Sequence, residues 1–169
     1  MKIVIMGYSG SGKSTLARSL GEALGLPVLH LDAVHWTPGW VGRPTAESAA
    51  MVADFLDSHD SWIIDGDYGK LHRDRRLQEA DQILLLRLPP LRCLYRVLKR
   101  KHRYKNETRP DMGEGCPEKV DLAFAKWVLW EGRDKKRAAF FDSLPEKYPG
   151  KVTNLRSQKQ IDAWLEAQR

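Results

Sequence analysis

Residues 7–14 read GYSGSGKS, which matches the phosphate-binding pattern G-x-x-x-x-G-K-[ST]. The stretch follows an apolar run at residues 3–6 and precedes apolar residues at helical spacing over 16–24, so it joins an expected strand to an expected helix. Glycines let the backbone curl until successive N–H groups point at phosphate oxygens, and the helix adds the positive end of its dipole. The stretch therefore predicts a site for a nucleoside triphosphate.

Two side chains at the end of this loop have separate expected roles. Lys13 would hold the β- and γ-phosphates, and the hydroxyl of Ser14 would coordinate Mg²⁺. ATP and Mg²⁺ are accordingly the expected cofactors. The loop residues that we predict to contact the nucleotide are Gly7, Ser9, Gly10, Ser11, Gly12, Lys13, Ser14 and Thr15.

Length and composition restrict the remaining possibilities. A chain of 169 residues suits one domain, spanning residues 1–169, with one core. No run approaches the about 20 apolar residues of a membrane span, and the first expected strand leaves no room for a signal peptide. Cys93 and Cys116 have no metal-ligand spacing. These features predict a cytoplasmic protein without a membrane partner, and they leave a monomer and a homodimer open.

Apolar runs alternate with helical patterns along the whole chain. Strands are expected at residues 3–6, 27–31, 61–64, 82–88 and 151–155. After the first helix, further helices are expected at 46–58 with Thr45 as N-cap, and at 69–79, 90–104, 118–142 and 158–168. Residues 105–117 have no helical period and predict a flap, within a lid of about residues 103–118. The alternation predicts the α/β class, with a parallel sheet covered by helices on both faces.

Two acidic residues follow expected strands, at the edge where such sheets bind ligands. Asp65 follows the third strand and would hold Mg²⁺ or its bound water, with a turn cap as the alternative. Asp32 ends the second strand and would orient or deprotonate a substrate hydroxyl, with a capping role as the alternative. Trp36, Trp40 and Tyr68 lie in neighbouring loops and would stack on a base or a sugar.

Basic residues concentrate near the expected lid. Residues 92–109 contain eight Lys or Arg and one acid, so this segment accounts for the net charge of +6. Two arginine pairs at four-residue spacing flank the flap, and a further arginine lies within it. They are Arg96 with Arg100, Arg133 with Arg137, and Arg109. We predict that they clamp the transferring phosphates, with Arg109 arriving as the lid closes. A solvated basic surface is the alternative.

Several stretches together resemble one family, the DNA topology modulation proteins, which are relatives of adenylate kinase. The stretches are the phosphate loop, HLD at 30–32 followed by Trp36, WIIDGDY at 62–68, and RPDM at 109–112 followed by EGCPE at 114–118. The resemblance covers essentially the whole chain. It implies a P-loop fold of the nucleoside-monophosphate-kinase type, with a five-stranded parallel sheet in the order 2-3-1-4-5 and a lid.

The resemblance also implies roles for residues near the nucleotide. Asp65 is similar to the aspartate that ends the third strand of adenylate kinases and serves Mg²⁺. Arg96 and Arg100 resemble the arginine pair at the base of the lid, which contacts adenine and phosphates. Arg156 falls where such enzymes close over the adenine.

Other positions resemble the adenylate kinases less closely. Arg133 and Arg137 are similar to the arginines that follow the lid. The sequence that forms the monophosphate pocket of adenylate kinases is absent, and Asp32 is more similar to the aspartate of shikimate or gluconate kinases. The resemblance therefore extends to the nucleotide-binding residues of the family more fully than to its acceptor-binding residues.

Two functions of different classes follow from these residues. The first is a phosphotransferase that moves the γ-phosphoryl group of ATP, with Mg²⁺, to a small acceptor such as a nucleotide or a sugar-like alcohol. The alternative is a nucleic-acid-associated regulator that binds or slowly hydrolyses ATP and lays its basic run on DNA. Direct DNA binding is the less favoured of the two, because a lid already explains the basic run and no DNA-binding motif is present.

Overall fold

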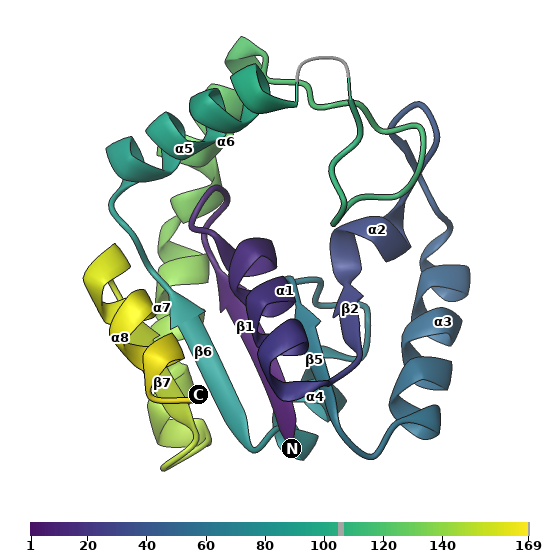
Figure 1. The fold of residues 1–169 in the computed structure, drawn as a ribbon, viewed down its shortest axis with the longest axis vertical. Helices are drawn as coiled ribbons and strands as arrows, with labels where there is room; N and C mark the ends of the chain where they lie inside the picture. The colour runs from purple at the N-terminus through teal and green to yellow at the C-terminus, as the bar shows by residue number, and fades with distance from the viewer. Residues whose placement is uncertain (105–106, 169) are drawn as a thin grey trace.

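Five parallel strands form the central sheet of the computed structural model, which describes residues 1–104 and 107–168 (Figure 1). Across the sheet they are β2 (Val28–His30), β5 (Trp62–Asp65), β1 (Lys2–Gly7), β6 (Gln82–Leu86) and β7 (Val152–Leu155). A second, two-stranded sheet pairs β3 (Trp36–Thr37) with β4 (Val41–Gly42). Numbered without this hairpin, the main sheet has the order 2-3-1-4-5, which confirms the prediction.

The central strand β1 is buried on both faces, which explains why its sequence is an apolar run rather than an alternating pattern. Ile3 and Ile5 point into one hydrophobic cluster, and Val4 and Met6 point into the other. All four side chains are fully buried. A strand that contributes to two cores in this way fixes the sheet between two layers of helices.

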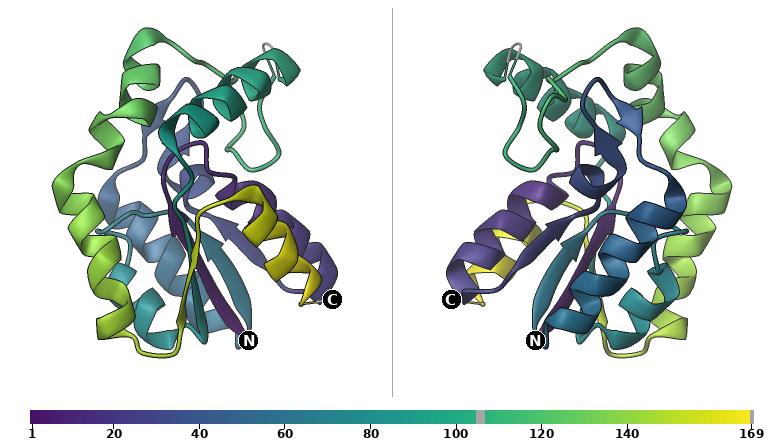
Figure 2. Two further views of the ribbon diagram at one scale, coloured as in Figure 1. Left: turned by 90° about the vertical axis from the view of Figure 1, so that its left-hand side faces the viewer. Right: turned by 90° about the vertical axis from the view of Figure 1, so that its right-hand side faces the viewer.

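The two layers of helices follow from these clusters (Figure 2). On one face lie α1 (Lys13–Leu24) and α8 (Gln158–Glu166). On the other face lie α3 (Thr45–Ser58), α4 (Arg73–Glu79) and α7 (Lys135–Lys147). Beyond the carboxyl ends of the strands lie α2 (Leu31–His35), α5 (Pro90–Arg103) and α6 (Leu122–Leu129) (Figure 1). None of the helices in the described part of the chain has the length and apolar character to cross a membrane.

The segment after β2 differs from its expected form as a strand followed by a loop. The chain enters the short helix α2 at Leu31, so Asp32 lies in a helical turn rather than at the end of a strand. Leu31 and Val34 are buried, one helical turn apart, against the cluster that also holds α3. Five residues are too few to show a helical period in a sequence. The strands β3 and β4 have two residues each, which is also too short to show an alternating pattern in the sequence.

The single helix expected over residues 118–142 is wrong. The chain forms α6, a 3₁₀ turn at Glu131–Arg133 and then α7. Asp121 and Asp134 each accept a hydrogen bond from the backbone N–H three residues on, so each caps the start of its own helix. Gly132 lies so close to Trp127 that a Cβ would approach the Trp127 backbone oxygen to 2.9 Å. The helical pattern of the sequence is therefore interrupted at the 3₁₀ turn, and a new helix begins after the Asp134 cap.

Smaller differences concern helix ends and the flap. Pro44 occupies the N-cap position of α3 and Thr45 is its first helical residue, so the expected Thr45 cap is wrong. The helix α4 begins at Arg73 rather than at residue 69. Thr108 and Pro117 form an isolated antiparallel bridge across the flap. Two residues of the expected flap, 105 and 106, lie outside the described residues.

Candidate functional site

The phosphate loop needs glycine for both conformation and space. Gly10 has a φ of +77°, which L side chains rarely adopt, and a Cβ there would lie 2.7 Å from the backbone oxygen of Cys93 in α5. At Gly7 the φ is +144° and a Cβ would lie 2.2 Å from the backbone oxygen of Leu86. The loop is therefore packed directly against β6 and α5, and its curl is fixed before any ligand binds.

Polar groups of this loop are left for a ligand. Gly12 occupies the N-cap of α1 without a side-chain hydrogen bond, so the first amides of the helix have no capping side chain. The Ser11 hydroxyl is fully buried and has no hydrogen-bond partner among the described residues. Uncapped amides at a helix N-terminus attract anions. The loop therefore fits phosphate groups.

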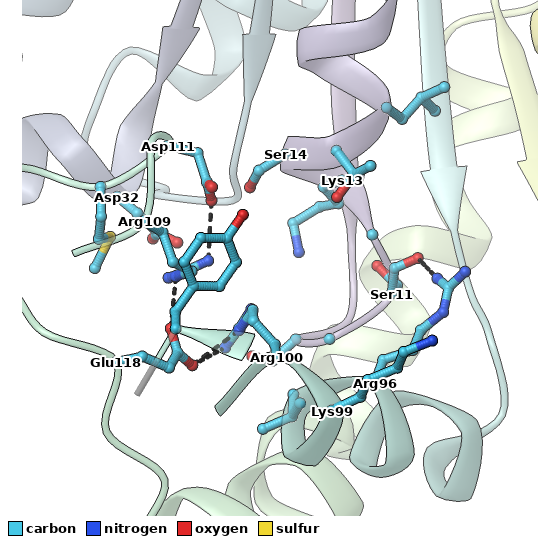
Figure 3. A pocket seen from close by; sticks show the side chains of 18 of the residues that line it. Ser11, Lys13, Ser14, Asp32, Arg96, Lys99, Arg100, Arg109, Asp111 and Glu118 are labelled. Atoms are coloured by element: carbon cyan, nitrogen blue, oxygen red, sulfur yellow. Dashed lines mark hydrogen bonds and ion pairs between the residues drawn. The ribbon is translucent and has the colours of Figure 1, made fainter. Parts of the chain in front are cut away.

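Lys13 folds back onto the loop and points into the pocket (Figure 3). Its Nζ donates a hydrogen bond of 3.0 Å to the backbone oxygen of Tyr8. Burial lowers the pKa of Lys13, and the charges of Asp32 and Asp65 act against this lowering. A lysine held by a single neutral carbonyl, with two carboxylates nearby, can transfer to a phosphate oxygen with little loss of other contacts.

Ser14 and Asp65 form the oxygen pair expected for Mg²⁺. The Ser14 Oγ donates to Asp65 Oδ2 at 2.7 Å, and His30 Nδ1 lies 2.5 Å from Asp65 Oδ1. Burial alone would lower the pKa of His30, but the hydrogen bond and the charge of Asp65 outweigh it and raise this pKa. The described residues bring together no cluster of three or more His, Cys, Asp or Glu. A magnesium ion on phosphates keeps several waters and needs no such cluster, so the pair fits it.

Arg96 marks the end of the pocket away from Asp32 (Figure 3). Its guanidinium donates to the backbone oxygen of Ser11 at 2.6 Å and also to Gln158 of α8. Lys99 of the same helix lines the pocket beside it. Arg156, expected near the adenine, is exposed and is not among the residues that line the pocket. Its backbone N–H donates to Gln160 Oε1 at 2.7 Å.

Asp32 lies at the opposite end, oriented by an aromatic side chain. The hydroxyl of Tyr68 donates to Asp32 Oδ1 at 2.6 Å. Burial and the charge of Asp32 raise the pKa of Tyr68, so this hydroxyl keeps its proton. Trp36 and Trp40 line the same pocket, their ring centroids 5.7 Å apart. Sequence reasoning assigned Tyr68 to stacking and did not find its bond to Asp32.

A buried arginine binds the backbone of Tyr68. The Arg76 side chain is fully buried, and its guanidinium donates to the backbone oxygens of Leu71 at 2.8 Å and Tyr68 at 2.9 Å. Burial lowers the pKa of Arg76 to about 10, so it still carries its charge at neutral pH. Two carbonyls of the loop after β5 thus depend on one cation.

Replacing Arg76 by methionine is expected to destabilise the fold by about 2–4 kcal/mol, because buried carbonyls would lose a charged donor. Equilibrium urea unfolding measures this free energy. The neighbouring Arg75 is the matched control, since it is half-exposed and pairs with Asp57 and Glu79 at the surface. Arg75→Met should destabilise the fold much less, because solvent screens surface ion pairs. Equal losses for the two variants would contradict the role of Arg76.

The lid arginine is held by two carboxylates of the lid itself (Figure 3). The Arg109 guanidinium is buried and lies 2.9 Å from Asp111 Oδ2 and 2.6 Å from Glu118 Oε2. Glu118 also pairs with Arg100 at 2.8 Å. Burial lowers the pKa of Arg100, and the charge of Arg109 lowers it further. Two predicted phosphate arginines are thus neutralised by acids that sequence reasoning did not assign to the site.

The pair formed by Arg133 and Arg137 does not have its expected geometry. Arg133 lies in the 3₁₀ turn and Arg137 in α7, so they do not share one helix face, and neither lines the pocket. Arg133 donates to the Leu88 backbone oxygen at 3.0 Å and stacks on the Tyr8 ring with its Cζ 4.1 Å from the centroid. Arg137 lies 3.1 Å from Asp67 Oδ2. Arg133 therefore supports the phosphate loop from outside the pocket.

The basic run at 92–109 does not form one continuous outer face. Arg96, Arg100 and Arg109 all turn toward the pocket, as described above. Lys101 donates to the backbone oxygen of Val120 at 3.0 Å. Lys105, the seventh basic residue of the run, lies outside the described residues. The inward arginines belong to the pocket rather than to a surface for a polyanion.

These groups line one pocket of about 1070 Å³. Such a volume is at the upper end of small-molecule sites and has room for a nucleotide and a second substrate. Of the residues predicted from the sequence, it brings together the loop from Ser9 to Thr15, Asp32, Arg96, Arg100 and Arg109. Gly7 and Asp65 lie just behind its lining, Asp65 through its bond to Ser14.

Known structures share this architecture. Shikimate kinase from Acinetobacter baumannii, solved with shikimate, is 15% identical to this chain and superposes with a TM-score of 0.59. The alignment covers 99% of this chain and 90% of the shikimate kinase chain. A gluconokinase from Sinorhizobium meliloti 1021 is 18% identical, covers 99% of this chain and 92% of its own, with a TM-score of 0.50. At such identities the likeness concerns the fold.

Sequence comparison assigns the family. A comparison with curated proteins finds no match. Residues 3–114, more than half of the chain, match the AAA_18 family, described as an AAA domain. This segment contains the phosphate loop, Asp32, Asp65 and Arg109, and it ends within the lid. The chain belongs to the AAA_18 family of AAA domains.

Proposed function

We propose that the protein is a phosphotransferase that moves the γ-phosphoryl group of ATP, with Mg²⁺, to the hydroxyl group of a small acceptor. One observation carries this proposal. Lys13 and Ser14 lie between Ser11 and Arg96 at one end of the pocket and Asp32 at the other (Figure 3), and the Ser14 hydroxyl donates to Asp65. A phosphate tail entering from the first end would meet an acceptor at the second. The resemblance to DNA topology modulation proteins remains a part of the proposal that rests on sequence alone.

The nucleotide half would act by positioning and by stabilising charge. The loop amides and Lys13 would hold the β- and γ-phosphate oxygens. Ser14 and Asp65 would hold Mg²⁺, which when bound neutralises charge on the same oxygens. Arg96 would keep the loop closed through its bond to the Ser11 backbone oxygen. Fixed donors of this kind act on the transition state without reorganising.

The acceptor half would supply a base. The Asp32 carboxylate would take the proton of the acceptor hydroxyl while that oxygen forms its bond to the γ-phosphorus and the bond to the β-phosphate oxygen breaks, releasing ADP. Tyr68 keeps its proton and donates to one Asp32 oxygen, which leaves the other oxygen for the acceptor. Arg109 would exchange its carboxylate partners for the transferring phosphate as substrates bind.

Acceptor-stimulated release of ADP tests the proposal. With ATP and Mg²⁺, a panel of small alcohols and nucleotides is expected to contain compounds that raise ADP release well above the rate without acceptor. Removal of Mg²⁺ by a chelator should abolish this stimulation, because the phosphate oxygens would lose their main counter-charge. ADP release that no compound stimulates, at a rate unchanged by the chelator, would contradict the proposal.

A further inference from the structure

The wall around Asp32 is built jointly by the lid and the β3–β4 hairpin. The Gly39 backbone N–H donates to the Gly115 oxygen at 2.9 Å, and Trp40 Nε1 donates to the Pro117 oxygen at 3.1 Å. Cys116 Sγ lies 3.2 Å from the Thr37 oxygen. These contacts place the aromatic hairpin and the charged lid residues in one wall of the pocket.

One residue of this wall is held in a strained conformation. Trp40 has a φ of +62°, one of two non-glycine residues with positive φ among those described. This region costs a non-glycine residue of the order of 1 kcal/mol or more, and such residues cluster at ligand-binding sites. Trp40 and Trp36 both line the pocket. The hydrogen bond from Trp40 Nε1 to the Pro117 oxygen holds the indole at the acceptor end despite this strain, where it can cover an apolar face or a cation.

One of the acids at this end, Asp111, is paired with a cation that has another proposed role. Asp32 and Asp111 both line the pocket at the end where Arg109 lies (Figure 3). Asp111 is buried and pairs with Arg109 at 2.9 Å. If Arg109 transfers to the phosphate, as proposed above, the Asp111 carboxylate loses its partner within a closed pocket. An unpaired buried carboxylate is costly, so a cation that replaces Arg109 would be favoured beside Asp111.

From this arrangement we propose that the acceptor is an alcohol that carries an ammonium group, with the ammonium taking the place of Arg109 beside Asp111. The inference rests on the phosphotransferase function proposed above. Trp36 and Trp40 would cover the apolar part of the acceptor and add cation–π attraction. An acceptor with a carboxylate would instead bring a second negative charge toward Asp32 and Asp111. Arg18 also lines the pocket, and its charge acts on His30, so it is the cation to test for a carboxylate acceptor.

Three six-carbon compounds separate these possibilities: glucosamine, a ring sugar with an ammonium group; glucose, the same ring without charge; and gluconate, an open-chain acid with a carboxylate. Their binding is measured by quenching of tryptophan fluorescence with a non-hydrolysable ATP analogue and Mg²⁺ present, so that a γ-phosphate is available to Arg109, and their turnover is measured by ADP release from ATP. We expect glucosamine to bind at least about tenfold more tightly than glucose, as for a close charge pair. Gluconate should bind more weakly than glucose.

Two charge-removing variants test the role of Asp111. Asp111→Asn keeps the shape and should reduce the preference for glucosamine over glucose at least about tenfold. Asp121→Asn is the matched control, because Asp121 also lines the pocket but caps α6, and asparagine caps a helix as well as aspartate does. It should leave the preference unchanged.

The possible failures are distinguishable. If gluconate or glucose binds as tightly as glucosamine, or Asp111→Asn leaves the preference intact, the ammonium inference is wrong while the phosphotransferase function stands. Tight binding of gluconate that is lost in Arg18→Gln would show a carboxylate acceptor. If none of the three compounds binds although ATP does, the inference is wrong. If ATP itself does not bind, the proposed function fails with it.

Discussion

Lys13→Ala is expected to lower kcat/KM for ATP by about 10²–10³-fold, the usual cost of removing a fixed charge donor from developing phosphate charge. The fold should survive, because the Lys13 Nζ makes one hydrogen bond, to the Tyr8 backbone oxygen, among the described contacts. Steady-state ADP release measures the rate, and circular dichroism with thermal melting checks the fold.

The control for this variant is Lys99→Ala. Lys99 also lines the pocket and has the same charge, but it is exposed on α5, away from Ser14 (Figure 3). Its loss should change kcat/KM by less than about tenfold, as for a solvent-screened charge. Equal losses for both lysines would mean that the pocket attracts ATP only through its overall charge, and the assignment of Lys13 would be wrong.

Asp32→Asn should lower kcat by about 10²–10⁴-fold, the range for removal of a general base. Asparagine keeps the size of the side chain and an oxygen that can accept from Tyr68, but it cannot take a proton. Because Asp32 lies at the end of the pocket away from Arg96, the affinity for ATP should change little. Rapid quench of a single turnover, together with equilibrium binding of ATP, separates the two effects.

Tyr68→Phe isolates the part of this effect that is due to orientation. Phenylalanine removes the 2.6 Å hydrogen bond to Asp32 and retains the carboxylate. The expected loss in kcat is smaller than for Asp32→Asn, because the base is still present but less fixed. If Asp32→Asn has full activity, Asp32 only serves the helix α2, and the acceptor chemistry must lie elsewhere in the pocket.

The fold was predictable where the sequence repeats a signal over many residues. The strands β1, β5 and β6 are apolar runs because each is buried between two layers, and such runs are visible without a structure. The phosphate loop was predictable because glycine at positive φ and a fixed lysine are required at set spacings. Since parallel strands present their carboxyl ends at one edge, Asp65 could also be placed near Ser14.

Long-range pairing was not predictable in the same way. The partners of Arg109 and Arg100 include Glu118, and that of Arg137 is Asp67, 70 residues away in sequence. Nothing in local spacing selects these acids among the others of the chain. A single chain also cannot show by its pattern that Arg76, in a polar helix, would be fully buried. Such residues become identifiable only when the loops that they support have been placed.

The break between α6 and α7 shows a further limit. Residues 118–142 have enough apolar residues at helical spacing to suggest one helix, yet Gly132 and the capping Asp134 divide it. The consequence reaches the site, because the break moves Arg133 into a turn that faces Tyr8 and Leu88. A glycine and a helix cap, the latter worth about 1 kcal/mol, thus separate the two arginines that the sequence had placed on one helix.

A crystal structure with Mg²⁺ and a non-hydrolysable ATP analogue would show where the triphosphate binds. We expect the β- and γ-phosphates within hydrogen-bond distance of the amides at residues 9–15 and of Lys13 Nζ, with the metal bound to the Ser14 hydroxyl. The γ-phosphate should point toward Asp32. Phosphates bound elsewhere, or a triphosphate whose end points away from Asp32, would contradict the proposed function.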